Sequence, residues 1–225
     1  MIRAKGLCLD IIPWSRTSHM VRWMTPDGVV TTVVKGAVRP KSAFLGQYDL
    51  NYTCEILYYA RARGEVHALR ECSPSDLREY LRRDYAFQVL SGYFRRLVVE
   101  LSPVGLDAVE WFDELENALR PIEVQTPEKL LSRMLAFEMR ILELMGLRPE
   151  IAENGGILEL RGERRMSLAP ETAACLVNPE GVFERAVLVD AARSIGVYYQ
   201  FHVDKVAEVR RSVVAMISKS KKGNS

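Results

Sequence analysis

The sequence predicts an α+β protein in which a small five-stranded barrel precedes an all-α domain. Residues 1–73 contain five short apolar and β-branched segments that are separated by turn residues and lack a helical period. From residue 74 onward, apolar residues recur at the spacing of about 3.6 that is typical of amphipathic helices. The chain has 225 residues, of which 48% are hydrophobic and 27% are charged, which is the composition of a globular protein. We therefore expect two domains, residues 1–73 and residues 74–225.

The strands expected in the first domain are separated by clear breaks. Pro13 ends the first segment, and residues 14–19 form a polar connection. The segment Thr25-Pro26-Asp27-Gly28 predicts a tight turn, because proline fixes φ early in the turn and glycine accepts a positive φ late in it. Five short strands with such turns favour an OB-fold barrel. The expected strands are residues 4–12, 20–24, 29–34, 48–59 and 65–71.

Start and stop signals divide the second domain into helices. Ser75 is a candidate N-cap for the first helix. Thr126-Pro127-Glu128 opens a later helix with a capping threonine, a proline at the first helical position and an acid in the first turn, and Gly146 ends that helix. Residues 154–170 predict irregular structure. The other expected helices are residues 107–119, 171–176, 184–196 and 204–218.

Positive charge is concentrated in the first third of the chain. The net charge of the whole sequence is +2, but residues 1–72 hold 10 Lys and Arg against 6 Asp and Glu, whereas residues 73–225 hold 21 against 23. A surface for a polyanion is therefore expected on the first domain. We see no secretory signal and no run of about 20 apolar residues, so we expect a cytoplasmic protein without a membrane segment.

The segment Val33 to Ser42 is the best candidate for a nucleic-acid surface. A β-branched strand ends there in glycine and is followed by a turn that carries Lys35, Arg39 and Lys41. These cations can neutralise successive phosphates, although a solvated basic strand end would have the same sequence. Trp14 follows a proline in a polar connection and is expected to be an exposed stacking surface, whereas Trp23 is assigned to the core. The further DNA-binding candidates are Arg16, Arg22, Arg61 and Arg63, of which the last two also fit a merely soluble loop.

No catalytic constellation is recognisable in the sequence. The histidines His19, His67 and His202 are scattered and none stands in a nucleophile motif. The chain has no GxxxxGK[ST] segment for ATP. The four cysteines form no CxxC pair, which argues against a disulfide framework and a self-contained zinc knuckle. We therefore expect a binding protein and not an enzyme.

Two segments of the chain resemble the RecO family of bacterial recombination mediators. The first is Lys35-Gly36-Ala37 with the following Arg39-Pro40-Lys41-Ser42, and the second is residues 135–149, which read Leu-x-Phe-Glu-x-x-Ile-Leu-x-Leu-Met-Gly-Leu-Arg-Pro. The resemblance implies an OB-fold followed by a helical domain. It also implies a nucleoid-associated protein that binds single- and double-stranded DNA, anneals complementary strands, joins RecR, contacts the C-terminal peptide of single-stranded-DNA-binding protein and helps to load RecA.

The chain departs from this family after Pro149. Many RecO proteins place a CxxC pair there and a second pair 15–20 residues later, where this chain keeps only Cys175. Tetrahedral zinc needs four ligands, so we predict that the family's zinc site is lost and that no other cofactor is bound. Cys175 is then expected to be a small buried apolar residue.

The helical domain is expected to provide the pocket for the partner peptide. The candidates are Arg140, Leu142 and Met145 near the end of one helix, or Lys205 and Arg210 on the last helix. The alternative to a DNA-binding mediator is an interaction adaptor whose barrel docks repair partners. Salt dependence separates the two, because phosphate binding falls steeply with salt and apolar docking does not. A third class, a small hydrolase or nuclease, would need a metal and has no ligand cluster to support it.

Overall fold

The computed structural model describes residues 1–61, 64–102, 108–122, 126–152, 155–160 and 164–219. The chain forms two compact units. The first consists of Met1–Arg82 and Arg95–Asn117, and the second of Arg83–Phe94 and Ala118–Ser225. The expected division into residues 1–73 and 74–225 stays a prediction.

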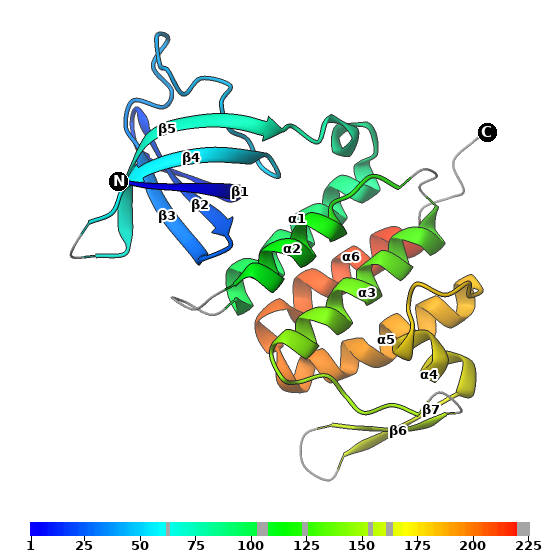
Figure 1. The fold of residues 1–225 in the computed structure, drawn as a ribbon. Coiled ribbons are helices and arrows are strands. Elements are labelled where there is room, and N and C mark those ends of the chain that lie inside the picture. Colours follow the sequence, from blue (N-terminus) through cyan, green and yellow to red (C-terminus); the bar gives the residue numbers. More distant parts are fainter. Residues whose placement is uncertain (62–63, 103–107, 123–125, 153–154, 161–163, 220–225) are drawn as a thin grey trace. The chain divides into compact units, whose positions relative to one another are not determined.

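The first unit contains a closed barrel with the strand order β1-β2-β3-β5-β4 (Figure 1). Strands β3 and β5 pair in parallel, and the other neighbouring strands pair antiparallel. This is the five-stranded topology of the OB-fold, so the predicted fold class of a barrel followed by helices is confirmed. The strands are β1 (Ile2–Ser15), β2 (Ser18–Thr25), β3 (Gly28–Val34), β4 (Thr53–Tyr59) and β5 (Val66–Asp76).

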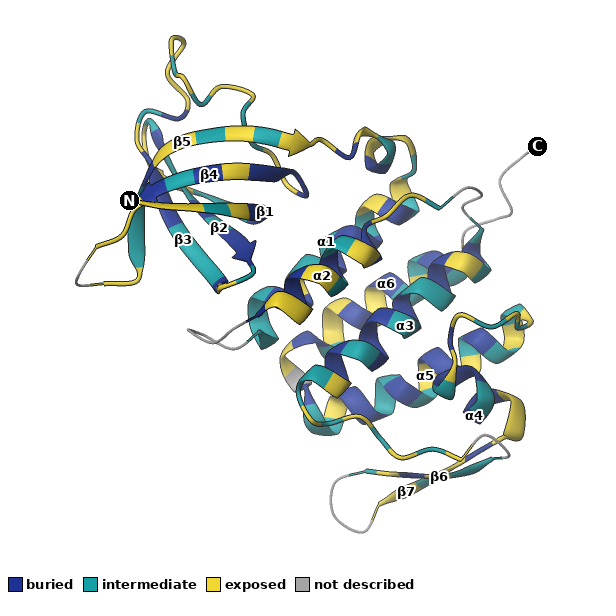
Figure 2. Cartoon of the chain, viewed as in Figure 1, coloured by how far each residue is buried: buried dark blue, intermediate teal, exposed yellow. Residues whose placement is uncertain are grey.

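The barrel closes around a core that alternation along the strands predicts. Trp23 is fully buried, as assigned from the sequence, and its indole N–H donates to Thr32 Oγ1 at 2.9 Å. Figure 2 shows buried residues alternating with more exposed ones along β4. The predicted turn joins β2 to β3, with Thr25 paired to Gly28 and Gly28 at φ +110°. The core side chains are Cys8, Val21, Trp23, Val34, Ala37, Tyr52, Cys54, Ile56, Tyr58 and Leu69.

Some strand boundaries differ from the prediction for identifiable reasons. Strand β1 continues through Pro13 to Ser15, because register shifts along its pairing with β2 accommodate the proline. Residues 48–52 contain a turn in place of a strand, with the Tyr52 N–H donating to the carbonyl of Asp49 at 3.0 Å, and β4 begins only at Thr53. Ser75 is not a helix N-cap: it lies in β5, and its hydroxyl donates to the carbonyl of Thr53 at 3.0 Å. The cap of the first long helix is nine residues later, where Asp84 Oδ1 accepts the Phe87 N–H at 2.7 Å.

Helix α2 (Val109–Ala118) is tied to the barrel by polar contacts of one glutamate. Glu116 accepts the hydroxyl of Thr53 at 2.5 Å and forms an ion pair with Arg78 at 2.9 Å. Arg78 is buried and also donates to the carbonyl of Asn51 and the hydroxyl of Thr53. Because a buried guanidinium is costly without such partners, this network fixes Arg78 as a structural cation.

The helices of the second unit pack around α3 (Pro127–Leu144), which contacts α4, α5 and α6. As predicted, Thr126 caps α3 by accepting the Lys129 N–H at 3.3 Å, and the helix ends before Gly146, which has φ +69°. The other helical segments are η1 (Glu79–Arg83), α1 (Tyr85–Leu101), α4 (Pro170–Val177), α5 (Arg185–His202), η2 (Asp204–Val206) and α6 (Ala207–Lys219).

A buried ion pair lies at the centre of this helical unit. Glu138 of α3 is fully buried, and its two carboxylate oxygens accept the Nε and Nη2 of Arg210 at 2.8 Å each. The hydroxyl of Tyr93 donates to the same carboxylate at 2.6 Å. Burial alone would lower the pKa of Arg210, but the adjacent carboxylate raises that pKa instead. The guanidinium is therefore charged, and Arg210 is held inside the unit.

The segment after Pro149 contains a short hairpin that the sequence does not predict. Strands β6 (Gly156–Glu159) and β7 (Arg165–Leu168) pair antiparallel, so the expectation of irregular structure over residues 154–170 is wrong for these residues. Cys175, on α4, is fully buried as predicted. Among the described residues, no helix is both long enough and apolar enough to cross a membrane.

Candidate nucleic-acid interface

A pocket on the first unit brings three of the predicted DNA-binding residues together. It has a volume of about 400 Å³ and lies where the β1–β2 turn meets the end of β3. Trp14, Lys35 and Arg39 contribute its aromatic ring and its two cations. Its full lining, which we call the basic pocket, is Trp14, Ser15, Thr17, Ser18, Val33, Lys35, Gly36 and Arg39.

A β-bulge places Trp14 in this pocket. Pro13 pairs with His19 and Ser15 pairs with Ser18, so Trp14 is an extra residue on β1 without a partner on β2. Bulges bend the strand and re-aim the side chain of the extra residue. The Trp14 side chain is 56% exposed, as expected from the sequence, although its ring lies beside a strand and not in a loop.

A tight turn after β3 carries the cations to the same place. Gly36 has φ +67°, and its N–H donates to the hydroxyl of Ser18 at 3.3 Å. The N–H of Val38 donates to the carbonyl of Thr17 at 3.3 Å, and the N–H of Arg39 donates to the carbonyl of Gly36. A Cβ at position 36 would lie 3.2 Å from Cδ of Arg39, so glycine accommodates both the backbone angle and the arginine stem.

The rest of the segment from residue 35 to residue 47, which we call the basic loop, is held in a series of turns. Backbone N–H groups of Ser42, Leu45 and Gln47 each donate to a carbonyl three residues earlier. At the far end, Tyr48 and His19 share a hydrogen bond of 2.8 Å between the phenol oxygen and Nδ1. Because its backbone is bonded along its length, the loop presents its cations from a defined surface.

The remaining predicted DNA-binding residues that the structure describes do not line the basic pocket. Arg16 is exposed in the turn between two pocket residues, whereas Lys41 is exposed on the loop but does not line the pocket. Arg22 is half-buried on β2, in register with Asp10 and Thr31. Arg61 is exposed after β4. Arg63 lies outside the described residues.

The two cations of the basic pocket and the neighbouring Lys41 and Arg16 carry uncompensated charge. Among the residues that the structure describes, Lys35, Arg39, Lys41 and Arg16 form no ion pair. They are also exposed, so they remain hydrated and available to a polyanion. With an exposed tryptophan ring beside two such cations, the pocket suits a ligand with a planar aromatic group and a phosphate.

The predicted partner-binding residues do not form one exposed surface. Leu142 and Arg210 are buried, and Arg210 is bonded to Glu138. The assignment of a docked peptide to these residues stays a prediction. Arg140 is half-buried and pairs with Glu143 at 3.2 Å, and Met145 is half-buried at the end of α3. Lys205 is exposed in η2.

The helical unit has a groove between α5 and α6, and Arg210, one of the residues expected near a partner pocket, lines it. Its volume is about 440 Å³, and exposed Arg193 and Arg211 stand among its largely apolar walls. Arg210 also lines it, from the side that reaches Glu138. The helical groove is lined by Val189, Ala192, Arg193, Gly196, Val197, Gln200, Ala207, Arg210, Arg211, Val214, Ala215 and Ser218. No spacing rule could have identified it, because the two helices meet only through the tertiary fold.

The thiols are in surroundings that disfavour reactivity. Burial raises the pKa of Cys8, and burial raises that of Cys175 to about 11. Hydrogen bonding to Cys72, together with burial, raises the pKa of Cys54. Because a protonated thiol is a poor nucleophile and a poor metal ligand, these three side chains act as core residues. Within the described residues, no three His, Cys, Asp or Glu side chains are grouped closely enough to hold a metal ion.

Comparison with known proteins finds several relatives that share one name. No family model matches the chain. It is 26% identical over 153 residues to the DNA repair protein RecO of Alkaliphilus metalliredigens, which covers 67% of this chain and 61% of that protein. The RecO of Gloeothece citriformis is 23% identical, and the match covers 75% of this chain and 68% of that protein. The RecO of Roseiflexus is 27% identical, and the match covers 70% of this chain and 54% of that protein. This chain is similar to RecO proteins.

The similarity covers only part of the length of these relatives. The matched region spans 54% to 68% of the length of these three relatives.

Proposed function

We propose that this chain is a non-enzymatic DNA repair and recombination mediator of the RecO type. It would bind single- and double-stranded DNA through the basic pocket and the neighbouring loop, and anneal complementary strands. The observation that carries the proposal is that Trp14, Lys35 and Arg39 line one pocket of an OB-fold barrel while both cations remain free of ion pairs among the described residues. The RecO name of its relatives supports the same role.

The form of the pocket suits annealing. Annealing makes and breaks no covalent bond: it requires a surface that screens the repulsion between two phosphate backbones and then releases the paired strands. Exposed cations on a barrel with a modest net charge provide screening without a deep, tight channel. In this role the protein would act together with RecR and prepare single strands for RecA.

The helical groove supports a second, compatible function in partner docking. Its apolar walls fit hydrophobic side chains. Exposed Arg211 fits a carboxylate, as does exposed Arg193, which also pairs with Asp190 at 3.3 Å. We propose it as the place for the acidic C-terminal peptide of single-stranded-DNA-binding protein. If the chain were only an adaptor, this groove would bind its partner while the barrel left DNA unbound.

Salt-dependent binding of a labelled oligothymidine tests the proposal. Fluorescence anisotropy at about 50, 100 and 200 mM salt should give a log affinity that falls linearly with log salt, with a slope of about −2 for three phosphate contacts on a single strand. The same titration with a labelled acidic peptide is the matched comparison, since apolar docking depends weakly on salt. Peptide binding without oligothymidine binding at the lowest salt would leave only the adaptor function.

A further inference from the structure

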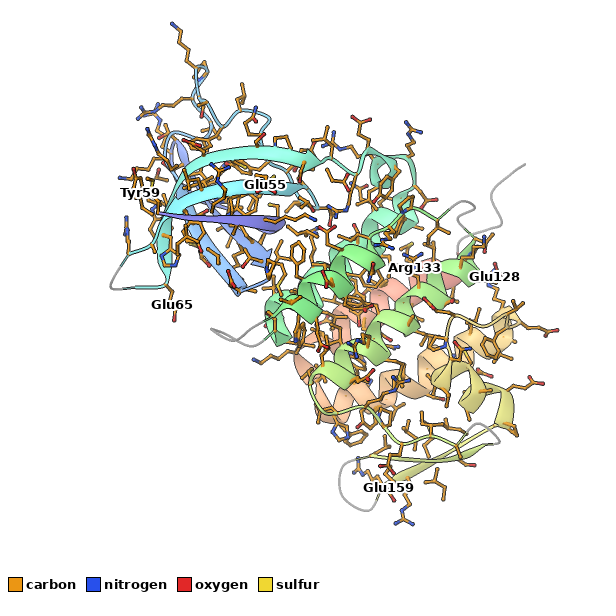
Figure 3. The ribbon with its side chains drawn as sticks, in the orientation of Figure 1. Glu55, Tyr59, Glu65, Glu128, Arg133 and Glu159 are labelled. Carbon is orange, nitrogen blue, oxygen red and sulfur yellow. The ribbon has the colours of Figure 1, made fainter. Side chains whose placement is uncertain are left out.

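We propose that a second stacking site for unpaired bases lies at Tyr59, and that a single strand held in the basic pocket runs across β3 and β5 to reach it. The inference rests on the proposed function and specifies its ligand, namely nucleic acid with unpaired bases. Tyr59 is the last residue of β4 and is labelled in Figure 3.

The register of the barrel connects the pocket to Tyr59. Val33, which lines the basic pocket, pairs with Ala68 of β5, and Ala68 pairs with Tyr59 of β4. Val33, Ala68 and Tyr59 therefore form one row across three adjacent strands. Because neighbouring strands are about 4.8 Å apart, Tyr59 lies about 10 Å from the wall of the pocket.

The row faces the outside of the barrel. The adjacent residues Val34, Leu69 and Tyr58 belong to the barrel core. Side chains alternate along a strand, so Val33, Ala68 and Tyr59 point away from that core, although Val33 is only 7% exposed where it lines the basic pocket. Tyr59 is 47% exposed, and the small side chain of Ala68 between it and Val33 leaves the row low in the middle. A single strand of nucleic acid that crosses β5 there meets only the small side chain of Ala68 between Val33 and Tyr59.

Cations flank the row along the same path. Arg61 is exposed two residues after Tyr59. Arg70 is exposed at a bulge, since Leu57 pairs with Glu71 and Tyr58 with Leu69. As β3 and β5 are parallel, Arg70 and Lys35 both lie two residues beyond the row at the same end. The acidic residues nearest in sequence are the exposed Glu65 and Glu71. Arg61 and Arg70 form no ion pair with these or with other described residues.

Aromatic faces at both ends of the path select unpaired bases. Trp14 and Tyr59 each expose a ring that can stack on a base, and stacking of this kind is tolerant of sequence. In a duplex the base faces are already stacked on one another, so only the cations can contribute to duplex binding. The path therefore favours single strands over duplex, whereas the cations alone would hold both.

A tryptophan placed at position 59 gives a direct test. The chain has three tryptophans, of which Trp23 and Trp111 are buried, so Trp14→Phe removes the exposed indole and keeps an aromatic face. In that background, oligothymidine should quench the fluorescence of Tyr59→Trp. The matched control is Tyr85→Trp in the same background, because Tyr85 is an exposed tyrosine at the start of α1. Its fluorescence should not change.

Affinity measurements complete the test. Tyr59→Leu should weaken oligothymidine binding roughly 5- to 100-fold and leave duplex binding within about twofold, whereas Tyr59→Phe should bind both like the wild type. Oligothymidine binding by anisotropy without a Tyr59→Trp signal, or with an unaffected Tyr59→Leu variant, would overturn the second site and leave the proposed function intact. An absence of oligothymidine binding by the wild type would overturn both.

Discussion

Reversal of the three charges of the basic loop, Lys35→Glu, Arg39→Glu and Lys41→Glu, should lower the affinity for single-stranded DNA about 100-fold or more. Each cation is exposed and free of ion pairs among the described residues, so each can contribute about 1 kcal/mol through a phosphate contact, and the introduced carboxylates add repulsion. The dependence of log affinity on log salt should also lose about 2 units of slope. Anisotropy titrations over a salt series measure both effects.

The matched control for this variant carries the same change of charge on the other unit. Arg83, Lys129 and Lys205 are exposed and form no ion pair within the described part of the chain. Their triple reversal to glutamate changes the net charge equally but should alter DNA affinity only a few-fold, through the long-range field. Equal losses in both variants would mean that net charge, and not the basic loop, determines binding. Circular dichroism confirms that both variants are folded.

Glu138→Ala should destabilise the helical unit by about 3–5 kcal/mol, because it leaves a buried guanidinium without its partner. Arg210 is only 3% exposed, and the Tyr93 hydroxyl loses its acceptor in the same variant. A urea titration that is followed by circular dichroism at a helix-sensitive wavelength measures the free energy of unfolding. The double variant Glu138→Leu with Arg210→Met should recover most of the loss, since an apolar pair removes both buried charges.

Gly196 provides an independent check on the same ion pair. A Cβ at this position on α5 would clash with Nη1 of Arg210, so Gly196→Ala should displace the guanidinium and destabilise the unit. The cost should be smaller when Arg210 is already methionine, which a double-mutant cycle measures. Additive effects of the two substitutions, or a Glu138→Ala cost below about 1 kcal/mol, would contradict the structural role of this pair.

Local signals predicted those parts of the fold that depend on a few neighbouring residues. The Pro26-Asp27 turn and the Thr126 cap each need one defined backbone geometry that their residue types prefer, and both are found. Ser75 carried the same capping signal, but pairing with β4 continues β5 past it to Asp76. A hydroxyl that bonds the carbonyl of Thr53 across the sheet cannot be read from the spacing of residues along the chain.

Tertiary packing determined the features that were missed. Glu138 interrupts an apolar stripe of α3, and only the fold brings Arg210 to it over a separation of 72 residues. Arg210, which was assigned to a partner-binding pocket, is buried at this ion pair. The β6–β7 hairpin has short strands with weak alternation, and the cysteines that would have indicated its place are missing from this chain.

Prediction of the basic pocket was partial for similar reasons. The basic segment was recognisable because Lys35, Arg39 and Lys41 directly follow an apolar strand. Which of these cations meet Trp14 depends on the bulge in β1 and on the positive φ of Gly36. Tyr59 gave no signal of its own, because its relation to the pocket arises from the pairing of β3 and β4 with β5.

The indole N–H resonances of the three tryptophans give the most direct test of DNA binding at the basic pocket. In a 1H–15N correlation spectrum, addition of oligothymidine should shift the Trp14 signal and leave those of buried Trp23 and Trp111 in place. The backbone amides of Thr17, Gly36 and Arg39 should move with it, because they belong to the same pocket. Binding of oligothymidine that shifts amides of α5 and α6 while the Trp14 indole stays unchanged would contradict this account.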